Sequence, residues 1–311
     1  MLNIRIALML VLTAFLPATS FGASGILLLA HGGSAEWNRQ VTALAADVNR
    51  TVPTEVAFGM AERASMQAAI DRLAARGITE IVAVPLFVSS WSSIITSTEY
   101  LLGLRAVAPP ALAFYAKMRH SPPPAAPTTA GHDDHTVMPD GTTPIKPPGP
   151  IRMTAALNDH PIVADILVSR ARSISRNPSD EAVVIVAHGP NNDEENRRWL
   201  TDMRSLAGQM RRSAPFASID SLTLRDDAPK AVRDQITAEL RTLVSQRLAE
   251  RRRVLIVPLL VSFGGIDRGL RDRLDGLSYA MPSAGLVPDD RLVTWILAMA
   301  AQNERPVAPA R

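Results

Sequence analysis

The chain has 311 residues, of which 47% are hydrophobic and 20% charged, and its net charge is only +3. This composition is typical of a globular protein, and the length suits two domains of ordinary size. So small a charge surplus, with no basic stretch interleaved with aromatic residues, argues against a nucleic-acid partner. The sequence contains no cysteine, which excludes disulfides, zinc–thiolate sites, iron–sulfur clusters and cysteine nucleophiles.

The N-terminal segment has the features of an export signal. Arg5 precedes an apolar run at residues 6–16, and small residues surround Ala23. This run is too short to span a bilayer, so we predict a signal peptide at residues 1–24 and a periplasmic or secreted protein. An uncleaved membrane anchor is the alternative. No later stretch has the length of a membrane span, so no stable span is expected after signal cleavage.

Between residues 25 and 119, apolar runs alternate with helix-type patterns. Continuous apolar runs indicate strands buried on both faces of a parallel sheet, and apolar residues spaced by three or four indicate helices. The strands predicted in this way lie at residues 25–30, 54–59, 80–88 and 111–116. The helices between them carry Val41, Leu44, Ala45 and Val48, then Met66, Ile70 and Leu73, and then residues 94–104. This alternation predicts a parallel sheet covered by helices.

Residues 120–150 interrupt the pattern. They hold nine of the 24 prolines and few apolar residues, which is typical of a linker or a long surface loop. The same stretch contains His132 and His135 on either side of two aspartates. Such a tract is a candidate for divalent metal capture, and a polar loop without a metal is the alternative.

The second half, residues 151–311, repeats the order of the first. After a helix with Ile162, Ile166 and Leu167, strands are predicted at residues 182–187, 218–224 and 254–262. The intervening helices carry Trp199, Met203, Leu206 and Met210, and then Val232, Ile236, Leu240, Val244 and Leu248, and a last helix spans 290–302. GILLLAHGG matches AVVIVAHGP, and EIVAVPLFVSS matches RVLIVPLLVSF. Two landmarks in the same order indicate a duplication.

A His-Gly pair ends the first strand of each half, at His31-Gly32 and His188-Gly189. In open parallel sheets, ligands bind beyond the carboxyl ends of the strands. Glycines there, including Gly33, let the backbone approach a ligand closely. An imidazole at that position can ligate a metal or exchange protons. We therefore predict that both histidines and the three glycines form the site.

Several other enzyme classes lack their defining residues here. No G-x-S-x-G elbow accompanies the His-Gly-Gly stretch, which argues against an α/β-hydrolase. Ala30 and Ala187 stand where a histidine phosphatase would have arginine. Neither a P-loop lysine nor a G-x-G-x-x-G follows a strand, which argues against a nucleotide-binding site.

Trp37 and Trp199 lie six and eleven residues after the two histidines. Aromatic side chains at such positions usually pack between helix and sheet, and this is the role we expect. Stacking on a flat ligand is the alternative.

Six segments together resemble the CbiX family of sirohydrochlorin chelatases. They are LLLAHGGS, VAFGMAERASMQAAIDRLAARGITEIVAVPLFVSS, HPIVADILVSRA, VVIVAHG, VLIVPLLVSFGG and LVPDDRLVTWI. Members of this family are class II chelatases related to protoporphyrin ferrochelatase. The resemblance covers residues 25–119 and 152–300. It implies two tandem flavodoxin-like halves that face one another across a cleft, and insertion of Co²⁺ or Fe²⁺, with Ni²⁺ as a further candidate, into a tetrapyrrole. His31 and His188 match the family's first-strand histidine, which binds metal and accepts protons from the macrocycle.

The chain departs from the family pattern at a second position. The family usually has another histidine eight residues after the proline of its third strand, and Ser93 and Ile266 stand there in this chain. Glu62, Glu99, Asp267 or the carboxylates of the tetrapyrrole are candidates to complete the ligand set. The missing histidines favour a second hypothesis, an exported metal- or tetrapyrrole-binding protein without turnover. A degenerate structural paralogue is a third.

Overall fold

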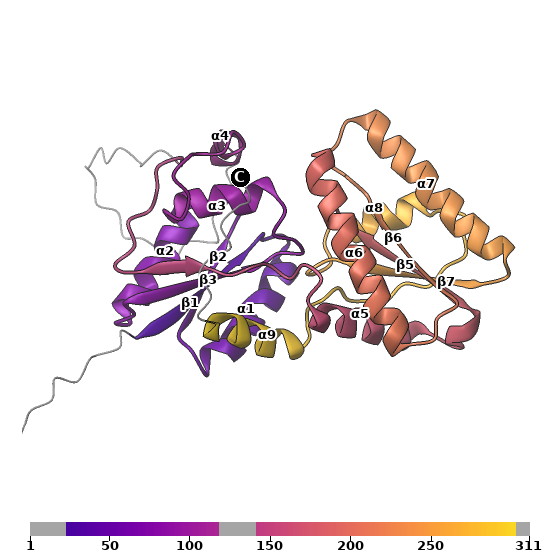
Figure 1. Ribbon diagram of the computed structural model, residues 1–311, viewed down its shortest axis with the longest axis horizontal. Helices are drawn as coiled ribbons and strands as arrows, with labels where there is room; N and C mark the ends of the chain where they lie inside the picture. Colours follow the sequence, from indigo (N-terminus) through magenta and orange to yellow (C-terminus); the bar gives the residue numbers. More distant parts are fainter. Residues whose placement is uncertain (1–22, 118–140, 303–311) are drawn as a thin grey trace, which may run out of the picture.

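The computed structural model describes residues 23–117 and 141–302 of the chain. Figure 1 shows two α/β halves side by side, each built on a parallel sheet with helices on both faces. The predicted fold class is therefore confirmed. Nearly all of the predicted signal peptide, together with His132 and His135, lies outside the described residues.

The first half contains a four-stranded parallel sheet in the order β2-β1-β3-β4. Its elements are β1 (Ser24–Ala30), α1 (Ala35–Asn49), β2 (Thr54–Phe58), α2 (Arg63–Ala75), β3 (Glu80–Leu86), α3 (Ser93–Leu101), α4 (Leu112–Lys117) and β4 (Ile151–Met153). The sequence prediction starts the second half at residue 151, but β4 pairs with β3 and so completes the first sheet.

The second half contains a three-stranded parallel sheet in the order β6-β5-β7. Its elements are α5 (Pro161–Ile174), the 3₁₀ helix η1 (Pro178–Asp180), β5 (Glu181–Ala187), α6 (Asp193–Ser213), β6 (Ser218–Thr223), α7 (Lys230–Ala249), β7 (Arg253–Leu259) and α8 (Ile266–Arg273). The last helix, α9 (Arg291–Ala301), returns to the first half, where it packs against α1 and β3.

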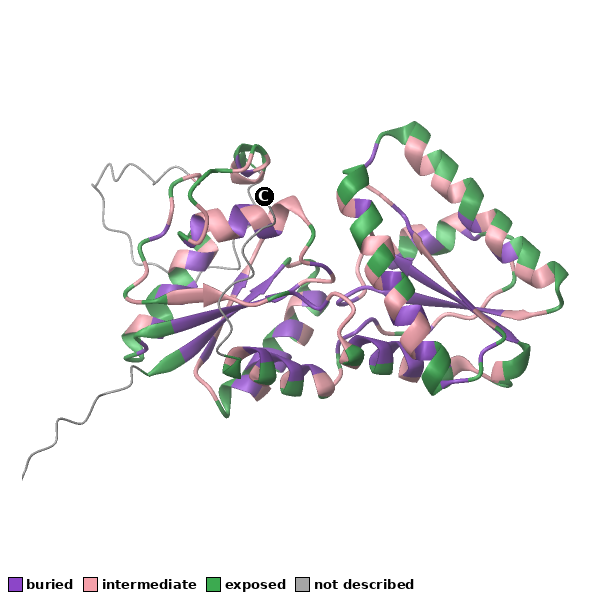
Figure 2. Cartoon of the chain, viewed as in Figure 1, coloured by how far each residue is buried: buried purple, intermediate pink, exposed green. Residues whose placement is uncertain are grey.

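The strands β1, β3, β5 and β7 are buried along almost their whole length, as continuous apolar strands require (Figure 2). Leu27 and Leu29 of β1 face α2, while Ile26 and Leu28 face α1 and α9. In the second half, one sheet face packs against α5 and α6 and the other against α7 and α8. One apolar cluster includes α1 and α9 of the first half together with α5 and α6 of the second. The two halves therefore share a core.

The segment 111–116, predicted as a strand, is instead the helix α4. Pro109 and Pro110 precede it, and the backbone N–H groups of Leu112 and Tyr115 donate to the carbonyls of Pro109 and Ala111. Proline is compatible with a helix start, and the alanines that follow favour helix over strand. Phe114 is 61% exposed, which a central strand would not allow. The fourth strand of the sheet is the short β4.

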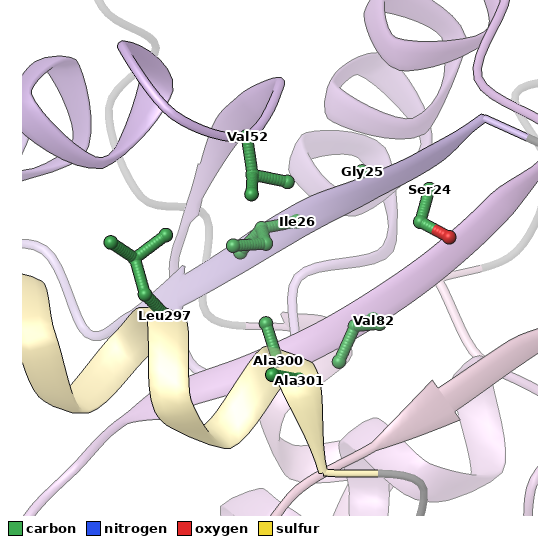
Figure 3. Close-up of a pocket in the computed structure, with 8 residues that line it drawn as sticks. All are labelled: Ser24, Gly25, Ile26, Val52, Val82, Leu297, Ala300 and Ala301. Carbon is green, nitrogen blue, oxygen red and sulfur yellow. The ribbon is translucent and has the colours of Figure 1, made fainter.

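A small apolar pocket of about 130 Å³ lies between the amino ends of β1 and β3 and the helix α9 (Figure 3). Ile26, Val82 and Leu297 are among the residues that line it. It is at the end of the first sheet opposite to the His-Gly pairs. No helix in residues 23–117 and 141–302 combines the length and apolarity that crossing a membrane requires.

Candidate functional site

The carboxyl ends of the two sheets face one another at the junction of the halves (Figure 1). Hydrogen bonds between segments that follow the strands support this arrangement. The Ser262 hydroxyl, just after β7, donates to Oε1 of Gln40 on α1 at 2.6 Å. The indole nitrogen of Trp199 on α6 donates to the carbonyl of Trp91, after β3, at 2.9 Å. Segments that follow β3 and β7 thus contact the helices α6 and α1 of the opposite half, at the junction where the sequence predicts the site.

His31 is exposed and follows β1 directly. Its Nδ1 lies 2.8 Å from the carbonyl oxygen of Gly32. A carbonyl can only accept, so Nδ1 carries the hydrogen and Nε2 carries the lone pair of the neutral ring. Gly32 has φ +81°, a conformation that favours glycine, and the N–H of Gly33 donates to Oδ1 of Asn38 at 2.9 Å. The loop therefore presents the basic nitrogen of His31 in a fixed orientation.

His188 is half-buried, and its Nε2 lies 3.3 Å from Oδ2 of Asp227, in the loop after β6. The adjacent Gly189 has φ +73°, and a Cβ at this position would lie 2.5 Å from Cβ of Thr223. Glycine is thus required twice, for its backbone conformation and for the space that Thr223 occupies. The two predicted histidines are held by different contacts, since the ring of His31 contacts the carbonyl of Gly32 and the ring of His188 contacts the carboxylate of Asp227.

Arg225 holds the loop that follows His188, a role that the sequence analysis missed. Its backbone N–H donates to the carbonyl of His188 at 2.6 Å, and its guanidinium donates to the carbonyls of Pro190 and Asn191. The guanidinium also pairs with Asp193 at 2.7 Å. An arginine directly after a strand at the predicted ligand-binding edge was the available signal, but its partners depend on how the loop folds.

Ser93 connects the two halves at the place where the family's second histidine is expected. Its hydroxyl lies 2.7 Å from the hydroxyl of Tyr115 on α4. Its backbone N–H donates to the carboxylate of Glu195 on α6. The histidine is thus replaced by a polar contact that spans the junction. Ile266, the corresponding residue of the second half, packs against the core between the second sheet and α7 and α8.

The acidic and phenolic groups at this junction are partly desolvated. Burial raises the pKa of Glu195, although the hydrogen bond from Ser93 opposes the shift. Burial also raises the pKa of Tyr115; the hydrogen bond with Ser93 lowers it, and the negative charges of Glu195 and Asp227 raise it further. Each half therefore contributes titratable groups to the same region.

The three carboxylates proposed to complete the ligand set have different surroundings. Glu62 lies four residues past the end of β2, as Asp227 lies four residues past the end of β6. Glu99 is 3.9 Å from Arg105, and Asp267 accepts from the N–H of Gly264, which precedes α8, at 2.7 Å. Within the part of the chain that the structure describes, no three histidine or acidic side chains are close enough to hold a metal ion alone.

The architecture of two facing parallel α/β halves is also found in solved structures. The chain is similar in structure to SirB from Bacillus subtilis with Fe³⁺, at a TM-score of 0.55 and 15% identity, over 89% of this chain and 93% of that one. SirB from Bacillus subtilis subspecies spizizenii in complex with cobalt gives 0.53 and 14%, over 89% and 93%. DR2241 from Deinococcus radiodurans, a multi-domain protein with structural similarity to chelatases, gives 0.50 and 16%, over 91% and 56%.

The family resemblance is found in sequence as well. Residues 25–95 match the sequence model of the CbiX family. This segment includes His31 and ends two residues beyond Ser93. A comparison with curated proteins finds no match. Residues 25–95 are thus similar in sequence to the CbiX family, and the chain shares its fold with the SirB structures.

Proposed function

We propose that the protein inserts a divalent metal into a tetrapyrrole of the sirohydrochlorin type. The observation that carries the proposal is His31, with its basic Nε2 at the carboxyl edge of the sheet, inside the segment that matches CbiX. The similar fold supports the same function, because both SirB structures hold a metal and one of them is described as a sirohydrochlorin chelatase. The metal and the macrocycle are substrates in this proposal.

Metal insertion requires proton acceptors beside the point where the metal enters. A divalent ion that enters the macrocycle displaces two pyrrole N–H protons, so two protons must leave. His31 is the first ligand through the lone pair of Nε2, and this lone pair can accept a proton once the metal has passed to the macrocycle. His188, paired with Asp227, and the desolvated Glu195 lie on the second half and are candidates to accept the other proton.

Imidazole and carboxylate donors suit Co²⁺, Fe²⁺ and Ni²⁺. We propose cobalt or iron as the substrate metal, since the SirB neighbours were solved with cobalt and with Fe³⁺. The N-terminal sequence supports an exported protein, with the reaction outside the cytoplasm.

A second candidate function is binding of the metal or tetrapyrrole without turnover. The occupation of the second-histidine position by Ser93, which is hydrogen-bonded to Tyr115 and Glu195, favours this candidate. It predicts one equivalent of bound ligand and no metallated product beyond the uncatalysed rate.

Absorbance spectroscopy of the purified chain with sirohydrochlorin and Co²⁺ separates the two candidates. We expect multiple turnovers, a rate about 100-fold lower in His31→Ala, and a smaller loss in His188→Ala, since one positioned base contributes roughly 10²–10⁴-fold. Circular dichroism verifies that each variant is folded. Unchanged rates in both variants would refute the proposed site, and a stoichiometric spectral change without turnover would favour the binding protein.

A further inference from the structure

One face of α6 contacts the loop between β3 and α3. Glu195, Arg198, Trp199 and Asp202 are spaced at i, i+3, i+4 and i+7, so they lie on one side of the helix. Each of the four contacts either Trp91 or Ser93, which belong to the short segment 91–93 of the first half. This pattern places a single helical stripe of the second half against a single loop of the first.

Trp91 is the centre of these contacts. The guanidinium carbon of Arg198 lies 4.3 Å from the centroid of the Trp91 ring, in a cation–π arrangement. The Trp199 indole donates to the Trp91 carbonyl at 2.9 Å, and Asp202 is hydrogen-bonded to the Trp91 side chain. Trp91 is nevertheless 41% exposed. Its position therefore depends on α6 and not on burial in the core of its own half.

The rest of the loop is anchored on both sides of Trp91. The N–H of Ser90 donates to Oδ1 of Asn158 at 2.7 Å, and the hydroxyl of Ser90 accepts from the N–H of Ala156 at 2.9 Å. Ser93 donates its N–H to Glu195. The loop thus joins the segment that leads into α5 to the face of α6.

We propose that Trp91 and this face of α6 form a latch between the two halves, and that the latch weakens as the pH rises because it encloses the carboxyl groups of Asp202 and Glu195. The latch is a property of the fold, so its test does not depend on the proposed reaction.

The surroundings of Asp202 set the direction of this effect. Its Oδ2 is buried and has no hydrogen-bond partner among the residues that the structure describes. Burial, followed by the negative charge of Asp159, raises the pKa of Asp202 from 3.8 to about 6, and the hydrogen bond with Trp91 opposes the rise. Burial raises the pKa of Glu195 as well. A raised carboxyl pKa stabilises the latched state at low pH, and this stabilisation is lost as the pH rises through about 6.

Other titratable and charged groups lie on α6 and on the elements packed against it. Asp159 and His160 come from the segment before α5, and Arg198 and Glu195 from α6 itself; of these, Asp159 acts on the pKa of Asp202. Burial lowers the pKa of His160, a shift of the opposite sign. Charged groups on the elements packed against α6 have partners elsewhere: Arg170 with Asp289, Arg172 with the carbonyl of Ser213, and Asp220 with Arg247.

Native-state hydrogen exchange of the loop amides, corrected for the intrinsic rate at each pH, measures the opening of the latch. If Asp202 returns to its ordinary pKa on opening, protection of residues 90–93 should fall up to about tenfold between pH 5 and pH 7.5. Asp202→Asn should remove most of this fall, and amides of β1 serve as the internal reference. Asp159→Asn should move the midpoint to lower pH.

His160→Asn is the matched control, because asparagine can still cap α5 while the imidazole is lost. The fall in protection should persist in this variant with the same midpoint. The proposal is wrong if the natural chain shows no change in protection over this pH range, if Asp202→Asn keeps the full change, or if His160→Asn abolishes it. Should Asp202→Asn fail to fold, the midpoint shift in Asp159→Asn remains as a separate test.

Discussion

His31 donates from Nδ1 to the carbonyl of Gly32, whereas His188 places Nε2 beside the carboxylate of Asp227. The same His-Gly pair is therefore held in two ways. In the first half the basic nitrogen is Nε2, which is presented from an exposed ring. In the second half Nε2 itself lies 3.3 Å from a carboxylate oxygen. At the level of single residues, the two halves therefore surround the same motif differently.

Gly189 gives a test of this local geometry in terms of stability. Gly189→Ala should destabilise the protein because alanine is strained at φ +73° and its Cβ would meet Thr223. Gly276→Ala is the control, since Gly276 has φ +78° and no atom within 4 Å of the added Cβ. We expect a cost of roughly 1–2 kcal/mol for the control and about 1–3 kcal/mol more at Gly189. Equal unfolding free energies in urea for the two variants would show that Thr223 does not restrict the loop.

The sequence was sufficient to predict the two histidines and their glycines at strand ends, but not their partners. Asp227 and Arg225 reach His188 because the loop after β6 folds back towards the end of β5. This depends on strand register and on the positive φ of Arg225, which no residue pattern in the chain specifies. Trp199 illustrates the same limit, since the expected packing of its ring gave no indication of its hydrogen bond to Trp91.

Among the helices and strands, α4, β4 and α9 show which features the sequence alone could and could not predict. The segment 111–116 was predicted as a strand because short apolar runs do not distinguish helix from strand. β4 has only three residues and lies after the proline-rich stretch, so its sequence contains no periodicity to detect. α9 was predicted correctly as a helix, but its packing on the first sheet is a tertiary feature that its own pattern cannot indicate.

Because α9 packs on the first half, loss of its buried side chains should destabilise the protein. Trp295 is 1% exposed and lies in the core that both halves share. Trp295→Ala should lower the free energy of unfolding by about 3–5 kcal/mol, as loss of a buried large aromatic side chain does. Thr294→Ala, on the exposed side of the same helix, should change it by less than about 0.5 kcal/mol. If chemical denaturation gave the two variants the same midpoint, α9 would not be a structural link between the halves.

At the scale of the whole molecule, two parallel sheets direct their carboxyl ends towards one junction, and a shared core and the α6 stripe hold them there. The first half supplies His31 and the loop from Ser89 to Ser93, and the second supplies His188, Asp227 and Glu195. The duplication seen in sequence therefore has a structural consequence. It places non-equivalent groups of the two halves at one junction.

Anomalous X-ray scattering from crystals soaked in Co²⁺ tests whether His31 binds the metal, because it locates the metal independently of turnover. We expect a cobalt peak at the junction, about 2.1 Å from Nε2 of His31, and its loss in crystals of His31→Ala. Cobalt bound only at sites remote from His31, or a peak that is unchanged in His31→Ala, would contradict the assignment of His31 as the residue that receives the metal.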